Sequence, residues 1–223
     1  MKIKYSIIFL FFICYVNGQV NLDPLTVGVS QGSHRIQLSK IDLSIKGNPY
    51  LKDGLSPFTI EGANSNVKLL RYNHYSDEME YLNENVSYDL DKLQNMIITF
   101  INSNKKFIYI EHYKLEDGNL ESGFLQILSE GKNINLYKKE KVILKEILQK
   151  EDIMDVGTLT KEYTSDKPIY FMNFKNDIIL IPNKKKEFIN FFKDDKIKAY
   201  INKEKINSTN ESDLIKLTKF INK

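Results

Sequence analysis

The feature that most constrains the fold is a long series of short hydrophobic runs between residues 58 and 181, most of them separated by connections of only a few residues. The runs are rich in β-branched and aromatic residues, and turn formers such as Asp117-Gly118-Asn119 bound them, which is the pattern of β-strands. Parallel strands need crossover connections of a dozen or more residues, so antiparallel pairing is favoured and a doubly wound nucleotide-binding fold is disfavoured. The predicted strands are 67–72, 78–82, 86–90, 96–101, 106–113, 123–128, 134–137, 141–147, 169–174 and 178–181.

The run 106–113 carries bulky side chains on both of its predicted faces. Successive residues of a strand alternate between faces, which places Ile108, Ile110 and His112 on one face. The odd-numbered residues from Phe107 to Tyr113 then lie on the other face. We therefore expect this strand to lie between two layers, or inside a barrel whose outer wall is partly covered.

After residue 182 the hydrophobic period changes to three and four residues, which is typical of amphipathic helices. Asn210, followed three residues later by Asp213, predicts a capped start for the last helix. We therefore expect an α+β fold, an antiparallel β-sheet or partly closed β-barrel followed by two or three C-terminal α-helices. The single domain would cover residues 34–223, β-rich over 34–181 and helical over 183–222. The apolar residues that carry the helical period are Phe188, Phe191, Phe192, Ile197, Tyr200, Ile201, Leu214, Leu217 and Ile221.

Before this domain, the first eighteen residues have the pattern of a secretory signal peptide. Lys2 and Lys4 precede an apolar run from Ile7 to Val16, and the small residue Gly18 follows it. The apolar run is shorter than the roughly 20 residues that span a bilayer, which favours cleavage over a retained anchor. The sequence predicts a signal peptide at 1–18, an extended lead segment at 19–33, and an exported protein of the periplasm or the cell exterior.

Cysteine content and charge exclude several classes of function. Cys14 is the only cysteine and lies in the predicted signal peptide, so the mature chain would have no thiol chemistry. The formal charge of +3 falls to +1 when Lys2 and Lys4 are removed, which gives no argument for a nucleic-acid partner. The basic run Lys184–Lys186 is interrupted by nearby acidic residues and is interpreted as a solvated helix face. No later apolar stretch is long enough for an integral membrane segment after cleavage.

The densest polar cluster lies between residues 71 and 80, where a strand with a basic residue turns into one with carboxylates. In a hairpin, His74 and Asp77 would flank the turn, and an imidazole beside a carboxylate can orient a general base or bind a divalent cation. An exposed hairpin with a cross-strand ion pair from Arg71 explains the same residues, and we favour this structural interpretation. The candidate binding residues are Arg71, Tyr72, Asn73, His74, Asp77, Glu78 and Glu80.

Other catalytic signatures are missing from the sequence. The three histidines have no metal-ligand spacing, and no serine lies in a Gly-x-Ser-x-Gly motif. The glycines do not form a phosphate-binding loop. We therefore assign no catalytic residue, no metal ligand and no cofactor.

Several segments resemble an uncharacterised family of exported proteins from Bacteroidetes. The most distinctive are Leu70-Arg71-Tyr72-Asn73 and Asp77-Glu78-Met79-Glu80, and the resemblance covers most of the mature chain. It implies a bacterial exported protein and no particular reaction. The other segments are Gly47-Asn48-Pro49-Tyr50-Leu51, Gly123-Phe124-Leu125-Gln126-Ile127-Leu128 with Gly131-Lys132, and the helices from Asn183.

The leading hypothesis is a non-enzymatic exported binding or scaffold protein of the bacterial cell envelope. The alternative is an extracytoplasmic hydrolase that uses His74 with Asp77, Glu78 or Glu80. A third possibility is that another envelope protein docks on exposed aromatic residues, and the candidates for this contact are Tyr72, Tyr75, Tyr81 and Tyr88.

Overall fold

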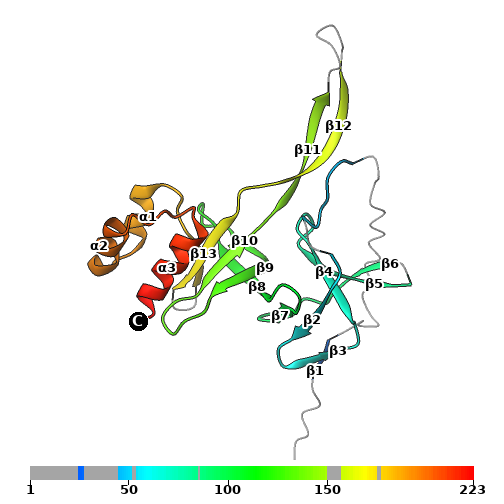
Figure 1. The fold of residues 1–223 in the computed structure, drawn as a ribbon, viewed down its shortest axis with the longest axis horizontal. Coiled ribbons are helices and arrows are strands. Elements are labelled where there is room, and N and C mark those ends of the chain that lie inside the picture. The colour runs from blue at the N-terminus through cyan, green and yellow to red at the C-terminus, as the bar shows by residue number, and fades with distance from the viewer. Residues whose placement is uncertain (1–24, 28–44, 52–53, 85, 150–156, 175–176) are drawn as a thin grey trace, which may run out of the picture.

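The computed structural model describes residues 25–27, 45–51, 54–84, 86–149, 157–174 and 177–223 (Figure 1). The predicted signal peptide at 1–18 and the start of the predicted domain, residues 34–44, lie outside the described residues. Within the described part, no helix combines the length and apolar character needed to cross a membrane. The chain is β-rich and ends in three helices, so the predicted α+β class is confirmed.

Five strands close into a barrel in the middle of the molecule. In chain order, each of these five strands pairs antiparallel with the next of the five, and the ribbon strands lie in the chain between the third and the fourth. Because the direction alternates, the first and fifth strands run the same way, so their closing pair must be parallel, and Ile179 lies opposite Lys114 there. The barrel strands are β8 (Lys105–Lys114), β9 (Leu120–Ser129), β10 (Leu136–Lys139), β13 (Ile169–Phe174) and β14 (Asp177–Leu180).

The N-terminal part of the sheet continues from β8 and curls around a second core. In this core Leu70, Met79 and Ile98 are fully buried and pack with Phe107 and Phe124 of the barrel strands. The added strands, in sheet order from β8, are β7 (Ile97–Phe100), β2 (Ser56–Ile60), β4 (Leu69–Asn73), β5 (Glu78–Asn83) and β6 (Val86–Asp89). Beside β2 lies β3 (Ala63–Ser65), which pairs in parallel with β1 (Leu25–Val27).

Strand β8 forms the wall between the two cores, as the bulky residues on both faces predicted. Phe107 faces the N-terminal core, whereas Ile110 faces the barrel interior with Leu125. The expected alternation is wrong beyond Ile110, because a bulge between Ile110 and Tyr113 shifts the register against β9. The bulge turns Tyr113 into the barrel interior, where it meets Phe171, instead of placing it on the face of Phe107.

A two-stranded ribbon projects from the barrel (Figure 1). It consists of β11 (Val142–Gln149) and β12 (Thr158–Ser165), which continue the β10 and β13 pair outward. Leu148 and Leu159 lie opposite each other toward its outer end, and both are exposed. Along the middle of β12, the backbone of Lys46 exchanges hydrogen bonds with Lys161 and Tyr163.

The helices α1 (Lys185–Phe191), α2 (Asp195–Lys203) and α3 (Glu211–Ile221) cover the outer face of β10 and β13. Leu136 and Met172 of these strands pack with Leu214, Leu217 and Phe188. The predicted cap is confirmed, because the side chain of Asn210 accepts a hydrogen bond from the backbone N–H of Asp213.

All ten predicted strands overlap strands of the structure. Sequence reasoning predicted no strand at β1, β2, β3 or β12, although the strand-rich region that it recognised begins at residue 58, inside β2. Pro57 and Ser56 have turn-forming character, yet both belong to β2, which pairs with β4 through them. β12 is largely polar because it lies in the projecting ribbon, so it lacks the apolar period of a core strand.

Candidate functional site

The predicted cluster at residues 71–80 forms the hairpin of β4 and β5. Arg71 lies opposite Glu80, and Asn73 lies opposite Glu78. The side-chain oxygen of Asn73 accepts hydrogen bonds from the backbone N–H groups of Tyr75 and Ser76 at 3.1 and 3.2 Å. Asp77 closes the turn with a φ of 60°, a conformation that aspartate tolerates better than most residues. The hairpin is therefore set by local turn chemistry.

Glu80 is the centre of a buried cluster, which we call the Glu80 cluster. Its carboxylate accepts hydrogen bonds from Arg71 at 2.9 and 3.1 Å, from the Tyr50 hydroxyl at 2.9 Å and from Asn73 at 2.6 Å. Ser87 donates a further hydrogen bond at 3.1 Å. The expected cross-strand ion pair is thus confirmed, but the expectation of an exposed hairpin is wrong, because the Glu80 side chain is only 2% exposed. Buried carboxylates require such partners.

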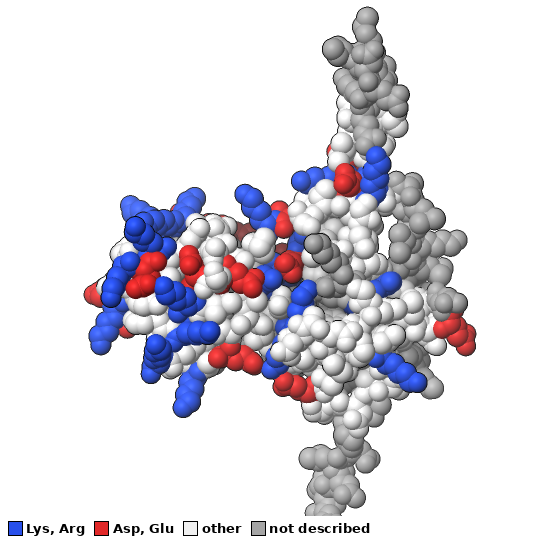
Figure 2. Space-filling model, in the orientation of Figure 1, with Lys and Arg blue, Asp and Glu red and all other residues white. Residues whose placement is uncertain are grey.

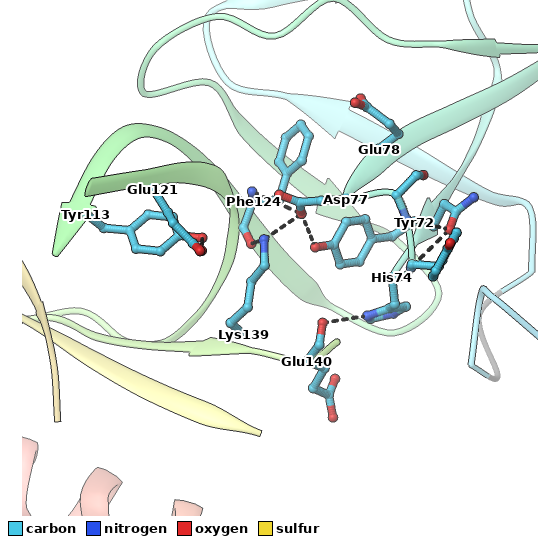
Figure 3. A network of polar contacts seen from close by, with 12 residues as sticks. Tyr72, His74, Asp77, Glu78, Tyr113, Glu121, Phe124, Lys139 and Glu140 are labelled. Atoms are coloured by element: carbon cyan, nitrogen blue, oxygen red, sulfur yellow. Dashed lines mark hydrogen bonds and ion pairs between the residues drawn. The ribbon is translucent and has the colours of Figure 1, made fainter. Parts of the chain in front are cut away.

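Asp77 is the centre of a second group, the Asp77 cluster, between the hairpin and the barrel (Figure 3). Its Oδ1 atom accepts hydrogen bonds from the Tyr72 hydroxyl and, at 3.4 Å, from the backbone N–H of Phe124. Lys139 of β10 reaches the same oxygen with its Nζ at 2.6 Å. The Lys139 ammonium also donates to the carbonyl oxygen of Phe124 at 3.1 Å.

Gly123 allows this close approach between the turn and the barrel. A β-carbon at this position would lie 2.7 Å from Lys139 Nζ and would overlap the Asp77 carboxylate. Its φ of 152° also lies outside the range that side-chain-bearing residues favour. The ion pair therefore rests directly against the bare backbone of β9.

Burial changes the proton affinities in the Asp77 cluster. Desolvation, opposed by the attraction of Asp77 and Glu121, lowers the pKa of the Lys139 ammonium. Burial, together with the neighbouring Asp77 carboxylate, raises the pKa of the Tyr72 hydroxyl well above its ordinary value. Tyr72 consequently remains a hydrogen-bond donor over the whole physiological pH range.

His74 is buried and turned toward the barrel rather than toward Asp77. Its Nδ1 donates to the carbonyl oxygen of Glu140 at 3.2 Å, and its ring centroid lies 4.3 Å from that of Tyr72. In Figure 3 the Tyr72 ring lies between the imidazole and the Asp77 carboxylate. The structure therefore does not use Asp77 to orient His74 as a general base.

Glu78 lies on the other side of the hairpin. Its carboxylate pairs with Lys92 at 2.6 Å, and both side chains are about one-quarter exposed. Burial, which outweighs the opposing effect of Lys92, raises the pKa of the Glu78 carboxyl. The seven predicted residues are thus divided between the Glu80 cluster, the Asp77 cluster and these separate contacts of His74 and Glu78.

Sequence reasoning missed Lys139 and Gly123. Lys139 follows Lys138 in a strand that begins with the apolar Leu136 and Tyr137. A lysine in a core strand needs a buried partner, so this position could have indicated a buried ion pair. Gly123 opens an apolar run, and an isolated glycine in a strand often marks close backbone approach.

Two pockets bordered by described residues lie away from both clusters. One, of about 350 Å³, is bordered by Leu69, Tyr81 and Leu82 on the hairpin's outer end. Another, of about 380 Å³, lies among the helices beside Phe188 and Ile206. Among the described residues, no group of three or more histidine, cysteine, aspartate or glutamate side chains is placed to hold a metal ion.

No family model, no curated protein and no solved structure matches the chain. The resemblance to exported proteins of Bacteroidetes stays a prediction from the sequence.

Proposed function

We propose that this chain is a non-enzymatic binding or scaffold protein, exported to the bacterial cell envelope. The observation that carries the proposal is that the buried polar side chains of the 71–80 hairpin form hydrogen bonds within the protein. The carboxylates of Glu80 and Asp77 each accept hydrogen bonds from several donors of the same chain. A general acid or base needs access to a substrate, and neither described pocket adjoins these groups.

The projecting ribbon is the surface on which we expect an envelope protein to dock. An isolated two-stranded ribbon is marginally stable in water, and this one exposes the cross-strand pair Leu148 and Leu159 at 51% and 67%. Of the tyrosines that the sequence offered for docking, Tyr72 and Tyr81 are only 1% and 6% exposed, whereas Tyr75 is 44% exposed and packs edge-on against Tyr163 of the same ribbon. A partner strand or loop packed on the two leucines would remove this apolar surface from water.

The charge pattern of the helical end does not favour a nucleic-acid partner. Carboxylates lie among the lysines of this end, as Figure 2 shows. Lys184 pairs with Glu187 and Lys198 with Asp195, each at 3.1 Å. These pairs divide the basic surface into short segments, whereas nucleic-acid binding relies on a continuous positive stripe.

Crosslinking in the bacterium that encodes the chain tests the docking surface. We expect a photoreactive residue at position 159 to give a defined crosslinked species in the envelope fraction. The variant Leu148→Lys should lose this species, whereas Leu120→Lys, which changes another exposed leucine away from the ribbon, should retain it. Cytosolic full-length protein that still carries Met1, or a photoreactive variant that forms no crosslink, would contradict the proposal.

The hydrolase alternative has its own test. Purified protein is assayed on ester, phosphoester and glycoside substrates beside His74→Ala and Asp77→Asn. We expect no turnover above the buffer rate. Turnover that either substitution abolishes would replace the binding proposal by an enzymatic one.

A further inference from the structure

Among the described residues, Lys139 and Asp77 differ from the other lysine–carboxylate pairs of equally short separation in the burial of the lysine. The pairs Lys92–Glu78 and Lys216–Glu204 have the same separation of 2.6 Å. The lysine side chain is 28% exposed in the first and 50% exposed in the second, but Lys139 is only 9% exposed. Water therefore has little access to the Lys139 amine, although the Asp77 side chain is 25% exposed.

The carboxyl group is prepared for attack by its hydrogen bonds. The Tyr72 hydroxyl and the backbone N–H of Phe124 both point at Oδ1 of Asp77. If the amine attacked the carboxyl carbon, negative charge would develop on this oxygen, and two fixed donors would stabilise it. The second oxygen, Oδ2, faces Gly123, where no side chain occupies the space.

The amine is also prepared, since only a neutral amine is a nucleophile. Burial lowers the pKa of Lys139, which raises the neutral fraction at a given pH. Transfer of one proton from the ammonium to the carboxylate at 2.6 Å converts the ion pair into a neutral amine and a carboxylic acid. A site of low dielectric constant favours the neutral pair more than water does.

We propose that Lys139 and Asp77 condense to an amide, so that the mature protein carries an intramolecular isopeptide cross-link. The Nζ–Cγ bond forms and the Cγ–Oδ2 bond breaks. Nζ gives up two of the three ammonium protons, and both leave with Oδ2 as one water molecule. The charges of the ion pair cancel, Oδ1 remains as the amide oxygen, and no oxidant or reductant takes part.

The cross-link would join the hairpin turn of the N-terminal sheet to β10 of the barrel. Cys14 is the only cysteine, so the chain has no intramolecular disulfide with which to make such a connection. The bond forms within one chain and needs no partner, so the test of the cross-link is independent of the proposed docking function. The cross-link would close the chain between residues 77 and 139 into a covalent loop. This loop would keep the N-terminal sheet attached to the barrel when the protein is pulled or cut by a protease.

Intact-mass measurement of the denatured protein tests the cross-link. We expect the wild-type chain to be lighter than its sequence mass by one water molecule. Trypsin should release a branched product in which residues 72–92 are joined to residues 139–141, since an acylated Lys139 is no longer a cleavage site. A wild-type chain of full sequence mass overturns the proposal.

Three variants establish the origin of the lost water. Lys139→Arg keeps the positive charge but supplies no nucleophilic amine, so it should have the full sequence mass, as should Asp77→Ala. Lys92→Arg alters the matched pair at Glu78 and should still lose water. The readout is made on denatured chains, so it does not depend on the stability of a variant.

Loss of water by succinimide formation at Asp53-Gly54 or Asp117-Gly118 is the competing explanation. Succinimides react with hydroxylamine, whereas the isopeptide does not, and they would persist in Lys139→Arg. Persistence of the mass loss in that variant therefore overturns the proposal. In Tyr72→Phe, which lacks one donor to Oδ1, we expect at least a tenfold slower loss of water, in line with the removal of one oxyanion donor.

Discussion

Replacing Glu80 by alanine should destabilise the fold much more than replacing Glu78, the other glutamate of β5. The change removes the acceptor for Tyr50, Arg71, Asn73 and Ser87 in a site where the Glu80 side chain is 2% exposed. The guanidinium of Arg71 would stay above the ring of Tyr50, 3.9 Å from its centroid, without its counter-ion.

The size of the loss in unfolding free energy follows from the polar groups that stay buried without Glu80. Removing one partner of a buried ion pair costs about 3–5 kcal/mol, because the remaining charge has no compensation. Each orphaned neutral donor adds about 1–3 kcal/mol when water cannot reach it. Arg71 is 15% exposed and gains some hydration, so these costs are not additive and we expect a loss of about 4 kcal/mol. The free energy of unfolding of a native domain is about 5–15 kcal/mol, so a loss of this size is large and measurable.

Urea unfolding followed by circular dichroism measures the effect as a lower midpoint at unchanged slope. The control is Glu78→Ala in the same strand, whose partner Lys92 is 28% exposed and remains hydrated. We expect this control to cost about 0–1 kcal/mol. If the two alanine variants unfold within about 0.5 kcal/mol of each other, the Glu80 cluster does not stabilise the fold as we argue.

The remaining predictions concern other elements. Gly123→Ala should lose more than about 1 kcal/mol of unfolding free energy, whereas Gly54→Ala, which meets no atom within 4 Å, should be neutral or stabilising in the same urea assay. Asn210→Ala should lose about 1 kcal/mol and reduce amide protection at the start of α3, as read by hydrogen exchange. The pKa of Glu78 is raised in the folded state, so the folded protein binds more protons than the unfolded chain as the pH rises above the ordinary value of 4.5. The unfolding free energy of wild type relative to Glu78→Gln should therefore fall as the pH rises through that window, and a rise would contradict the assignment.

The hairpin illustrates which features of the site are predictable from sequence. The Arg71–Glu80 ion pair follows from a short turn between two strands, since the register of a hairpin is set by its loop. The burial of this ion pair cannot be predicted from the hairpin alone. Glu80 is buried because Tyr50, 30 residues before it, lies over Arg71 and donates to the same carboxylate.

The Asp77 cluster lay beyond sequence reasoning for the same reason. Asp77 and Lys139 are far apart along the chain, and they meet only because the hairpin turn packs against β9 and β10. The sequence suggested His74 as the partner of Asp77, because both flank one turn. The barrel instead offers the carbonyl oxygen of Glu140 to His74 and the amine of Lys139 to Asp77.

By itself, the sequence determined the strand and helix pattern, the antiparallel pairing of consecutive strands and the cap at Asn210. These depend on side-chain periodicity and on contacts between residues a few positions apart. Tertiary structure alone decided the closure of β14 on β8, the bulge that turns Tyr113 inward, and the placement of Lys139 against Asp77. Such contacts join distant residues, and their geometry is set when whole layers pack together rather than by any local preference.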